Sequence, residues 1–290
     1  MKSINYLIVV CVLFMSCNSD ETDCCAGLDQ PRLIVKLKFD STQERLNNIG
    51  EPATIPTTNA AQSPIFSKMS ANYIELAPNE FTLLGEGEIV FEGSETNVGG
   101  EQAIDFQSAQ FAGNNEMFFS MPLSQVQAGD FNWVRVSLAY QEGDIDFLAE
   151  DGNDYTGTLA SFVGYNTYIS SFNLNGSAID VNANRLQGFW AFETLGFTAQ
   201  GQAPEGATTV PNPLFSSSPI PQGSCVVTGQ FVNGLTISGD ETEDVIVTLS
   251  FSTNNSFEWT EVNFDGKYEP SAGEQVVDMG LRGLIPSVSN

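Results

Sequence analysis

Apolar and polar residues alternate with a period of two through much of the chain after residue 30. In the stretch 33–39, LIVKLKF, the residues Leu33, Val35, Leu37 and Phe39 share one parity. The same style recurs in FNWVRVSLAY (131–140), DVIVTLSFST (244–253) and SFEWTEVNF (256–264). Successive side chains of a strand point to opposite faces of its sheet, so this pattern predicts strands with a buried face.

Turn signals separate these runs. Asn-Gly and Asp-Gly dipeptides supply the positive φ angles that tight hairpins need, and they occur at Asp151-Gly152, Asn175-Gly176, Asn233-Gly234 and Asp265-Gly266. No long stretch has apolar residues at helical spacing, and only short turns are expected near Pro122–Gln127. The pattern predicts an all-β chain folded as an antiparallel β-sandwich with long Pro-rich loops.

Two segments interrupt the alternation. Residues 47–64 are polar and contain proline, and residues 198–223 hold five of the thirteen prolines. A loop this long is usually functional, disordered or a linker. We interpret the second segment as a surface loop of one β-sandwich domain spanning 31–290. The alternative is a pair of β domains divided near residue 205.

The first sixteen residues have the composition of an export signal. Lys2 gives a positive start, and Tyr6 to Met15 is an apolar stretch of ten residues. A bilayer-spanning helix needs about 20 apolar residues, so this stretch is too short to be one. Residues 1–16 are therefore expected to be a signal peptide.

The residues around Cys17 carry the one family resemblance in the chain. Phe14-Met15-Ser16-Cys17 resembles the lipobox of bacterial lipoproteins, with phenylalanine where that family prefers leucine. The resemblance implies cleavage before Cys17, acylation of its thiol and a lipidated acidic tether over 17–30. Ser19-Asp20-Glu21 is similar to the signal that sends Bacteroidetes-type lipoproteins to the outer face of the outer membrane. The alternative for this run is a solvated linker.

The charge balance excludes some partners. The chain has 10 basic and 36 acidic residues, and loss of the leader would remove only Lys2 from this set. Such an excess of negative charge disfavours nucleic acid and anionic lipid surfaces. It is typical of a soluble exported surface, a calcium-binding protein or a protein with a cationic partner.

Three cysteines remain for the mature chain after Cys11 leaves with the leader and Cys17 is acylated. An exported protein can form disulfides. We expect Cys24 or Cys25 to pair with Cys225; the alternative is that Cys225 is a buried thiol. The adjacent Cys24 and Cys25 could bond to each other only with strain.

Common catalytic groups are missing. The chain has no histidine, which removes Ser-His-Asp and Cys-His catalysis and His-based zinc sites. None of the five lysines follows a serine by three positions, and there is no Gly-x-Ser-x-Gly elbow and no P-loop. A pair of carboxylates could still hydrolyse glycosides. The candidates are Glu193, Glu258 and Glu261, each near a tryptophan, although solvent-facing strand carboxylates are the simpler interpretation.

Acidic turns suggest calcium as the most plausible ion, because calcium prefers hard oxygen ligands. The first cluster contains Asp151, Asn153 and Asp154, and the second contains Asp240, Glu241, Glu243 and Asp244. Neither has EF-hand spacing, and acidic hairpin turns often bind no metal. Asp40-Ser41-Thr42 resembles the O-glycosylation sequon of exported Bacteroidetes proteins, which makes Ser41 a candidate acceptor.

Three tryptophans and several tyrosines could contribute a sugar-stacking surface, although aromatics within strands are more often core. The sequence thus predicts a lipid-anchored outer-membrane protein facing the cell surface, which acts without catalysis as a binding or accessory module for an envelope protein assembly or an extracellular ligand. The alternative is a carboxylate-based glycoside hydrolase or a glycan-binding lipoprotein on the same scaffold.

Overall fold

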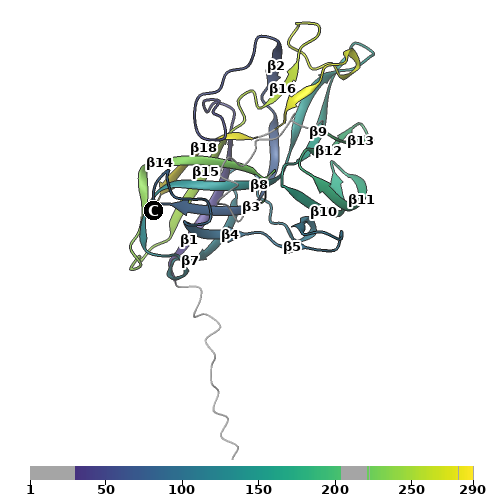
Figure 1. Cartoon of the computed structure of the whole chain (residues 1–290). Helices are drawn as coiled ribbons and strands as arrows, with labels where there is room; N and C mark the ends of the chain where they lie inside the picture. Colours follow the sequence, from purple (N-terminus) through teal and green to yellow (C-terminus); the bar gives the residue numbers. More distant parts are fainter. Residues whose placement is uncertain (1–29, 204–220, 222, 280, 290) are drawn as a thin grey trace, which may run out of the picture. The chain divides into compact units, whose positions relative to one another are not determined.

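The computed structural model describes residues 30–203, 221, 223–279 and 281–289. The chain from Pro31 onward forms one compact unit (Figure 1). The leader, Cys17, the acidic run Ser19-Asp20-Glu21, and the cysteines Cys24 and Cys25 lie outside the described residues. The predictions made for them therefore stay predictions.

Strands make up nearly all of the regular structure. They are β1 (Arg32–Asp40), β2 (Asn59–Gln62), β3 (Ile65–Ala77), β4 (Glu88–Glu92), β5 (Glu95–Thr96), β6 (Ala103–Asp105), β7 (Met117–Pro122), β8 (Gly129–Leu148), β9 (Asp154–Phe162), β10 (Asn166–Leu174), β11 (Ser177–Leu186), β12 (Phe189–Thr194), β13 (Phe197–Gln202), β14 (Cys225–Ile237), β15 (Val245–Ser252), β16 (Phe257–Thr260), β17 (Val276–Asp278) and β18 (Arg282–Ser289). The helical elements of the described residues are short 3₁₀ turns, namely η1 (Phe106–Ser108), η2 (Leu123–Gln125) and η4 (Pro270–Ala272). The all-β prediction is confirmed.

The largest sheet is built around the twenty-residue strand β8. Its strand order is β13-β12-β9-β8-β3-β4, and β14 also pairs with β8. The first half of β8 pairs with β14 along one edge, the second half pairs with β9, and β3 pairs along the other edge. Strands from before and after residue 205 therefore share one sheet, as the labels around β8 in Figure 1 indicate.

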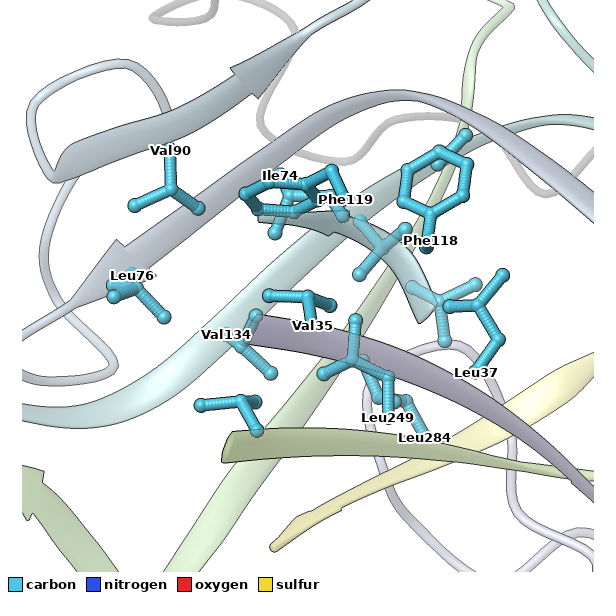
Figure 2. Close-up of a cluster of buried hydrophobic side chains, with 14 of the residues drawn as sticks. Val35, Leu37, Ile74, Leu76, Val90, Phe118, Phe119, Val134, Leu249 and Leu284 are labelled. Carbon is cyan, nitrogen blue, oxygen red and sulfur yellow. The ribbon is translucent and has the colours of Figure 1, made fainter. Parts of the chain in front are cut away.

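The main core lies between this sheet and a four-stranded sheet with the order β18-β15-β1-β7. Figure 2 shows Ile74, Leu76 and Val134 from the large sheet facing Val35 and Leu249 of the smaller one. Leu249 is fully buried. Burial of apolar surface stabilises by about 25 cal/mol per Å², so this interior accounts for the sandwich-like packing of the two sheets.

Two smaller cores cover opposite faces of the other half of the large sheet. On one face, Phe162 of β9 packs with Ile169 and Leu174 of β10, which belongs to a four-stranded sheet with the order β11-β10-β6-β5. On the other face, Leu159 packs with a cluster that contains Trp259, in the three-stranded sheet β17-β16-β2. Alternate residues of β9 thus pack into two different cores.

Most strand predictions are confirmed. The runs 33–39, 131–140 and 244–253 lie within or largely coincide with β1, β8 and β15, whereas only Phe257–Thr260 of the run 256–264 is a strand. The short turn expected near Pro122–Gln127 is η2. Asn175-Gly176 forms a two-residue hairpin turn with φ angles of 46° and 87°, and Asp151-Gly152 lies in the turn between β8 and β9.

Other local predictions were wrong. Asn233-Gly234 is not a hairpin turn but part of a bulge within β14, where the register with β8 shifts between Gln230 and Leu235. Asp265-Gly266 lies in a long connection between β16 and β17 rather than in a tight hairpin. The segments expected to be loops, 47–64 and 198–223, overlap the strands β2 and β13. These strands contain few large apolar residues, so their sequences do not indicate a strand. The expectation that the strands pair antiparallel also has an exception, because β1 pairs with β15 in parallel.

Buried tyrosines give the fold a dependence on alkaline pH. Burial and the nearby Glu142 carboxylate raise the pKa of Tyr140 far above its ordinary value. Burial, with a smaller effect of Glu274, raises the pKa of Tyr268 to about 12. The native state therefore holds these phenol protons more tightly than the unfolded chain, in which tyrosine titrates at about 10.

We expect the free energy of unfolding to carry the full tyrosine contribution below pH 10 and to fall as the pH rises above it. For Tyr268 the loss occurs between about pH 10 and 12. Tyr268→Phe should therefore flatten the decline in that window, measured by urea unfolding at a series of pH values. Identical slopes for the variant and the wild type would contradict this assignment.

Candidate functional site

The three candidate catalytic carboxylates are buried, which corrects the expectation that they face solvent. Glu193, Glu258 and Glu261 are 2%, 6% and 7% exposed. Isolated carboxylates are costly to bury, so each needs partners within the fold.

Glu193 stabilises two neighbouring turns. Its side chain comes from β12 and accepts a hydrogen bond from the Asn175 side-chain amide at 2.6 Å and from the Gly196 backbone N–H at 2.6 Å. Asn175 belongs to the β10–β11 turn and Gly196 to the β12–β13 turn. Each oxygen of Glu193 is thus occupied by a donor of the fold itself.

Glu258 belongs to a buried charged cluster. One oxygen accepts a hydrogen bond from Arg45, and the other accepts from the Asn59 side chain at 2.6 Å. Asp278 lies opposite Glu258 in the β16–β17 ladder and places its carboxylate 3.8 Å from the same guanidinium nitrogen of Arg45. These contacts connect the segment after β1 to the three-stranded sheet.

Glu261 organises the turn that follows β16. One of its oxygens accepts hydrogen bonds from the backbone N–H groups of Asp265 and Gly266, at 3.1 and 3.0 Å. The structure therefore gives all three carboxylates folding contacts and places none of them in the main cleft described below.

The tryptophans do not form an exposed platform. Trp259 is fully buried and packs against Phe257 and Tyr268. Trp190 packs on the same cluster and is half-buried, as is Trp133. Trp259 is therefore a core residue, the interpretation that its position within a strand favours.

The first acidic turn has internal partners for two of its candidate calcium ligands. Asp151 accepts hydrogen bonds from the Asn153 backbone at 3.0 Å and from the Tyr155 hydroxyl at 2.9 Å. Hydrogen bonds from Asn153 and Tyr155 lower the pKa of Asp151. Asp154 forms an ion pair with Lys267 at 2.8 Å.

The second acidic turn is similar. Glu241 accepts hydrogen bonds from the backbone N–H groups of Ser238 and Gly239, at 2.5 and 3.1 Å, and Asp240 accepts one from the Ser238 hydroxyl. Asp244 accepts a hydrogen bond from the Arg32 backbone at 2.8 Å, and Glu243 is exposed. Within the described ranges, no group of three or more acidic or cysteine side chains is arranged to hold a metal ion.

Cys225 and Ser41 occupy different environments. Cys225 is the first residue of β14 and is buried, while its expected partners lie outside the described residues. Ser41 is exposed in the turn after β1, where Asp40 accepts hydrogen bonds from the Thr42 backbone and hydroxyl. Disulfide pairing and glycosylation at these residues stay predictions.

A hollow among the described residues has a volume of about 350 Å³, and we call it the β3–β5 cleft. It lies where the large sheet meets the sheet that contains β5, β6 and β10. Asn72 and Tyr73 of β3 form one wall, and Glu92 and Gly93 follow from the end of β4. Glu95, Gln102, Tyr165 and Pro221 also line the cleft. This volume is in the range of small-ligand pockets.

Glu95 is the carboxylate of the β3–β5 cleft that has hydrogen-bond donors within it. It accepts a hydrogen bond from the Tyr165 hydroxyl at 2.9 Å and another from the Gln102 side-chain amide. Glu92 is also exposed and lines the cleft, and its carboxylate has no hydrogen-bond donor or cation as a partner in the described part of the chain. Among the described residues, the cleft lining contains two carboxylates and no lysine or arginine.

A buried charged pair lies beside Tyr73 on the same face of β3. Glu75 accepts hydrogen bonds from the backbone N–H groups of Gly85 and Gly87, at 3.1 and 2.5 Å. The Arg135 guanidinium lies 3.8 Å from Glu75. Burial, together with the negative charges of Glu75 and Glu92, raises the pKa of Tyr73 well above its usual range. The phenol is therefore neutral at physiological pH.

Close packing at Gly93 shapes the cleft. Its N–H donates to the Asn72 carbonyl at 2.8 Å. A Cβ at position 93 would lie 2.5 Å from the Asn72 side-chain oxygen, which is shorter than any ordinary contact. A neighbouring hollow of about 70 Å³ shares Asn72, Glu92 and Gly93 with the cleft.

Sequence reasoning did not identify this cleft. Its residues come from five separated segments, and the pairings of β3 with β4, β5 with β6 and β6 with β10 bring most of them together. The one local signal is FEGSE at 91–95, in which a glycine lies between two acidic residues that follow a short strand.

Comparison of the chain with protein-family models, with curated proteins and with solved structures found no match. In the part of the chain that the structure describes, no helix is long and apolar enough to span a bilayer.

The burial of Glu258 gives a stability prediction. Glu258→Gln removes the hydrogen-bonded carboxylate from the largely buried Arg45 and leaves only the more distant Asp278 beside it, and breaking a buried ion pair costs about 3 kcal/mol. We therefore expect the free energy of unfolding to fall by about this amount in urea denaturation. Glu243→Gln makes the same chemical change on exposed surface and should alter stability by less than about 0.5 kcal/mol. Equal stability of the two variants would contradict a structural role for Glu258.

Proposed function

We propose that this chain is a lipid-anchored protein of a bacterial outer membrane, displayed on the cell surface, which binds an envelope protein or an extracellular ligand without catalysing a reaction. The proposed lipid anchor is supported by the apolar leader that ends at Cys17 and by the run Ser19-Asp20-Glu21 that follows it. Acyl chains on one cysteine give stable anchoring, because each buried CH₂ contributes about 0.8 kcal/mol.

The contacts that the candidate carboxylates make within the fold favour binding over catalysis. Glu193 and Glu258 use both oxygens in contacts within the fold, and Glu261 holds a turn. A glycosidase needs two carboxyl groups that reach the scissile bond, one of them kept protonated by an apolar environment. Glu92 and Glu95 do line a cleft, but both are on exposed surface.

The β3–β5 cleft supports a ligand-binding role for the same scaffold. It is concave, its polar groups converge from several strands, and one buried polar side chain, Asn72, forms part of its wall. Such a combination is typical of ligand sites. A glycan hydrolase is the competing function, because two carboxylates and two tyrosines line this cleft.

The anchor is tested by Cys17→Ser. We expect this variant to lose palmitate labelling and to leave the outer-membrane fraction, because no other acyl acceptor is available at the cleavage point. Cys11→Ser is the matched control, since it changes a cysteine within the leader and should leave labelling and fractionation intact. Normal outer-membrane retention of Cys17→Ser would contradict the anchor.

The absence of catalysis is tested with a broad polysaccharide panel. The purified lipoprotein should release no reducing ends above the background of a heat-denatured sample. Release that Glu92→Gln or Glu95→Gln abolishes would establish a hydrolase in the cleft and overturn the binding proposal. Release abolished only by Glu193→Gln or Glu258→Gln, in variants shown to be folded, would also overturn it.

A further inference from the structure

Strand β13 forms one end of the large sheet, and its outer edge has no partner strand among the described residues (Figure 1). Its inner edge pairs with β12 in one unbroken antiparallel register, which begins at Thr194 and Phe197 beside the hairpin turn. Every residue of β13 is exposed or half-buried. The strand therefore offers a row of backbone N–H and C=O groups to a further strand.

The direction of these backbone groups follows from the hairpin that β13 forms with β12. The Ala203 N–H donates to the Gly188 carbonyl at 2.8 Å, on the β12 side. Successive residues of a paired strand direct their N–H and C=O groups to opposite edges. Odd-numbered residues of β13 therefore face β12, as Ala203 does, and even-numbered residues direct both backbone groups outward. The outward-facing residues are Thr198, Gln200 and Gln202.

Strand β13 lacks the features that keep sheet edges from pairing. Proteins protect such edges with charges, proline or bulges. Strand β4, at the other end of the same sheet, has two glutamates and a register shift in its pairing with β3. In contrast, β13 has no charged residue, no proline and no register shift. In a chain with 36 acidic and 10 basic residues, two copies can thus approach along this edge without placing like charges opposite each other.

The outer edge of β13 is complementary to itself in the antiparallel orientation. When Gln200 lies opposite Gln200 of a second copy, Thr198 lies opposite Gln202, and all outward-facing residues of both copies take part. Each such pair of residues exchanges two hydrogen bonds, so the pairing makes about six. A register shifted by two residues leaves fewer pairs within β13, so the register centred on Gln200 is favoured.

The side chains agree with this register. The outward-facing residues meet as pairs of polar side chains, threonine with glutamine and glutamine with glutamine. On the other face, Phe197 is 65% exposed and would lie opposite Ala203, and Ala199 would lie opposite Gly201. Trp190 of β12 already covers Gly201, because a Cβ at this position would lie 2.6 Å from its ring. Polar residues thus meet polar ones, and apolar residues meet small ones.

We propose that this chain forms a dimer through the outer edge of β13, with the two-fold axis at Gln200, so that the large sheets of two copies join into one. The interface is isologous, because each copy contributes the same strand. The partner is a second copy of this chain, and this self-association goes beyond the binding function proposed above.

Cross-linking of the full lipoprotein in detergent tests the register. Gln200→Cys places two thiols opposite each other, since the Cα atoms of such a pair are about 5.5 Å apart. A short bismaleimide should therefore join the two copies and double the mass of the band in a denaturing gel. Thr198→Cys is the matched control, because its two copies would lie about 13 Å apart along the strands.

We expect several-fold less cross-linked dimer from Thr198→Cys than from Gln200→Cys. A mixture of Thr198→Cys and Gln202→Cys chains should restore the cross-linking, because these positions are paired in the dimer. The wild-type lipoprotein, treated in the same way, gives the background from the native cysteines. Equal yields from Gln200→Cys and Thr198→Cys, or a yield from Gln200→Cys no higher than this background, would overturn the proposal.

A charge at the two-fold axis tests the dimer itself. In sedimentation velocity, the mass of the wild-type protein should rise toward twice that of the monomer as its concentration increases. Gln200→Lys places two lysines opposite each other and should weaken dimerisation by about fivefold or more, because like charges directly opposite destabilise strand pairing. Gln230→Lys makes the same change at an exposed position of β14 and should leave dimerisation unchanged.

The two lysine variants distinguish pairing at β13 from a general effect of charge. Equal dimerisation of Gln200→Lys and Gln230→Lys would place the contact elsewhere and overturn the proposal. A wild-type protein that stays monomeric at every concentration would also overturn it, whether or not this edge pairs with a strand of another protein. Circular dichroism checks that both variants remain folded.

Discussion

The pairing of strand β8 with three other strands is the constraint on which the rest of the structure depends. One edge of β8 is divided between β14 and β9, and the other edge pairs with β3. Its residues from Val134 to Ile145 are almost all buried, on both faces of the sheet. A strand covered on both faces must bury polar side chains as well as apolar ones, and Arg135 is therefore paired with Glu75 across the β3–β8 ladder.

The β3–β5 cleft follows from this arrangement. The face of β3 that points away from the main core carries Tyr73 and Glu75, while Ile74 and Leu76 point into it. The short strands β5 and β6 approach the same region because β6 pairs with β10 of a neighbouring sheet. Polar side chains from two sheets thus line one hollow, and the structural carboxylates Glu193 and Glu258 lie in the lining of neither hollow that shares Asn72.

The sequence predicts the strands with strong alternation, because a strand with one buried face has an apolar residue at every second position. It predicts Leu33, Val35 and Leu37 as core and the turn at Asn175-Gly176. It does not predict β2 or β13, which contain few large apolar side chains, or the bulge at Asn233-Gly234, since a glycine with positive φ occurs in bulges and hairpins alike. The candidate site was missed for a similar reason, because Asn72, Glu92 and Tyr165 become neighbours only through pairings between distant strands.

Native-state hydrogen exchange tests the central role of β8 most directly, because it reports the stability of each strand separately. The structure predicts that the amides of β8 and of its partners β3, β9 and β14 exchange through one common opening, with the same dependence on denaturant. If the amides of β14 and β15 instead exchanged as a separate unit, with a stability unrelated to that of β8, a single sheet organised around this strand would be contradicted.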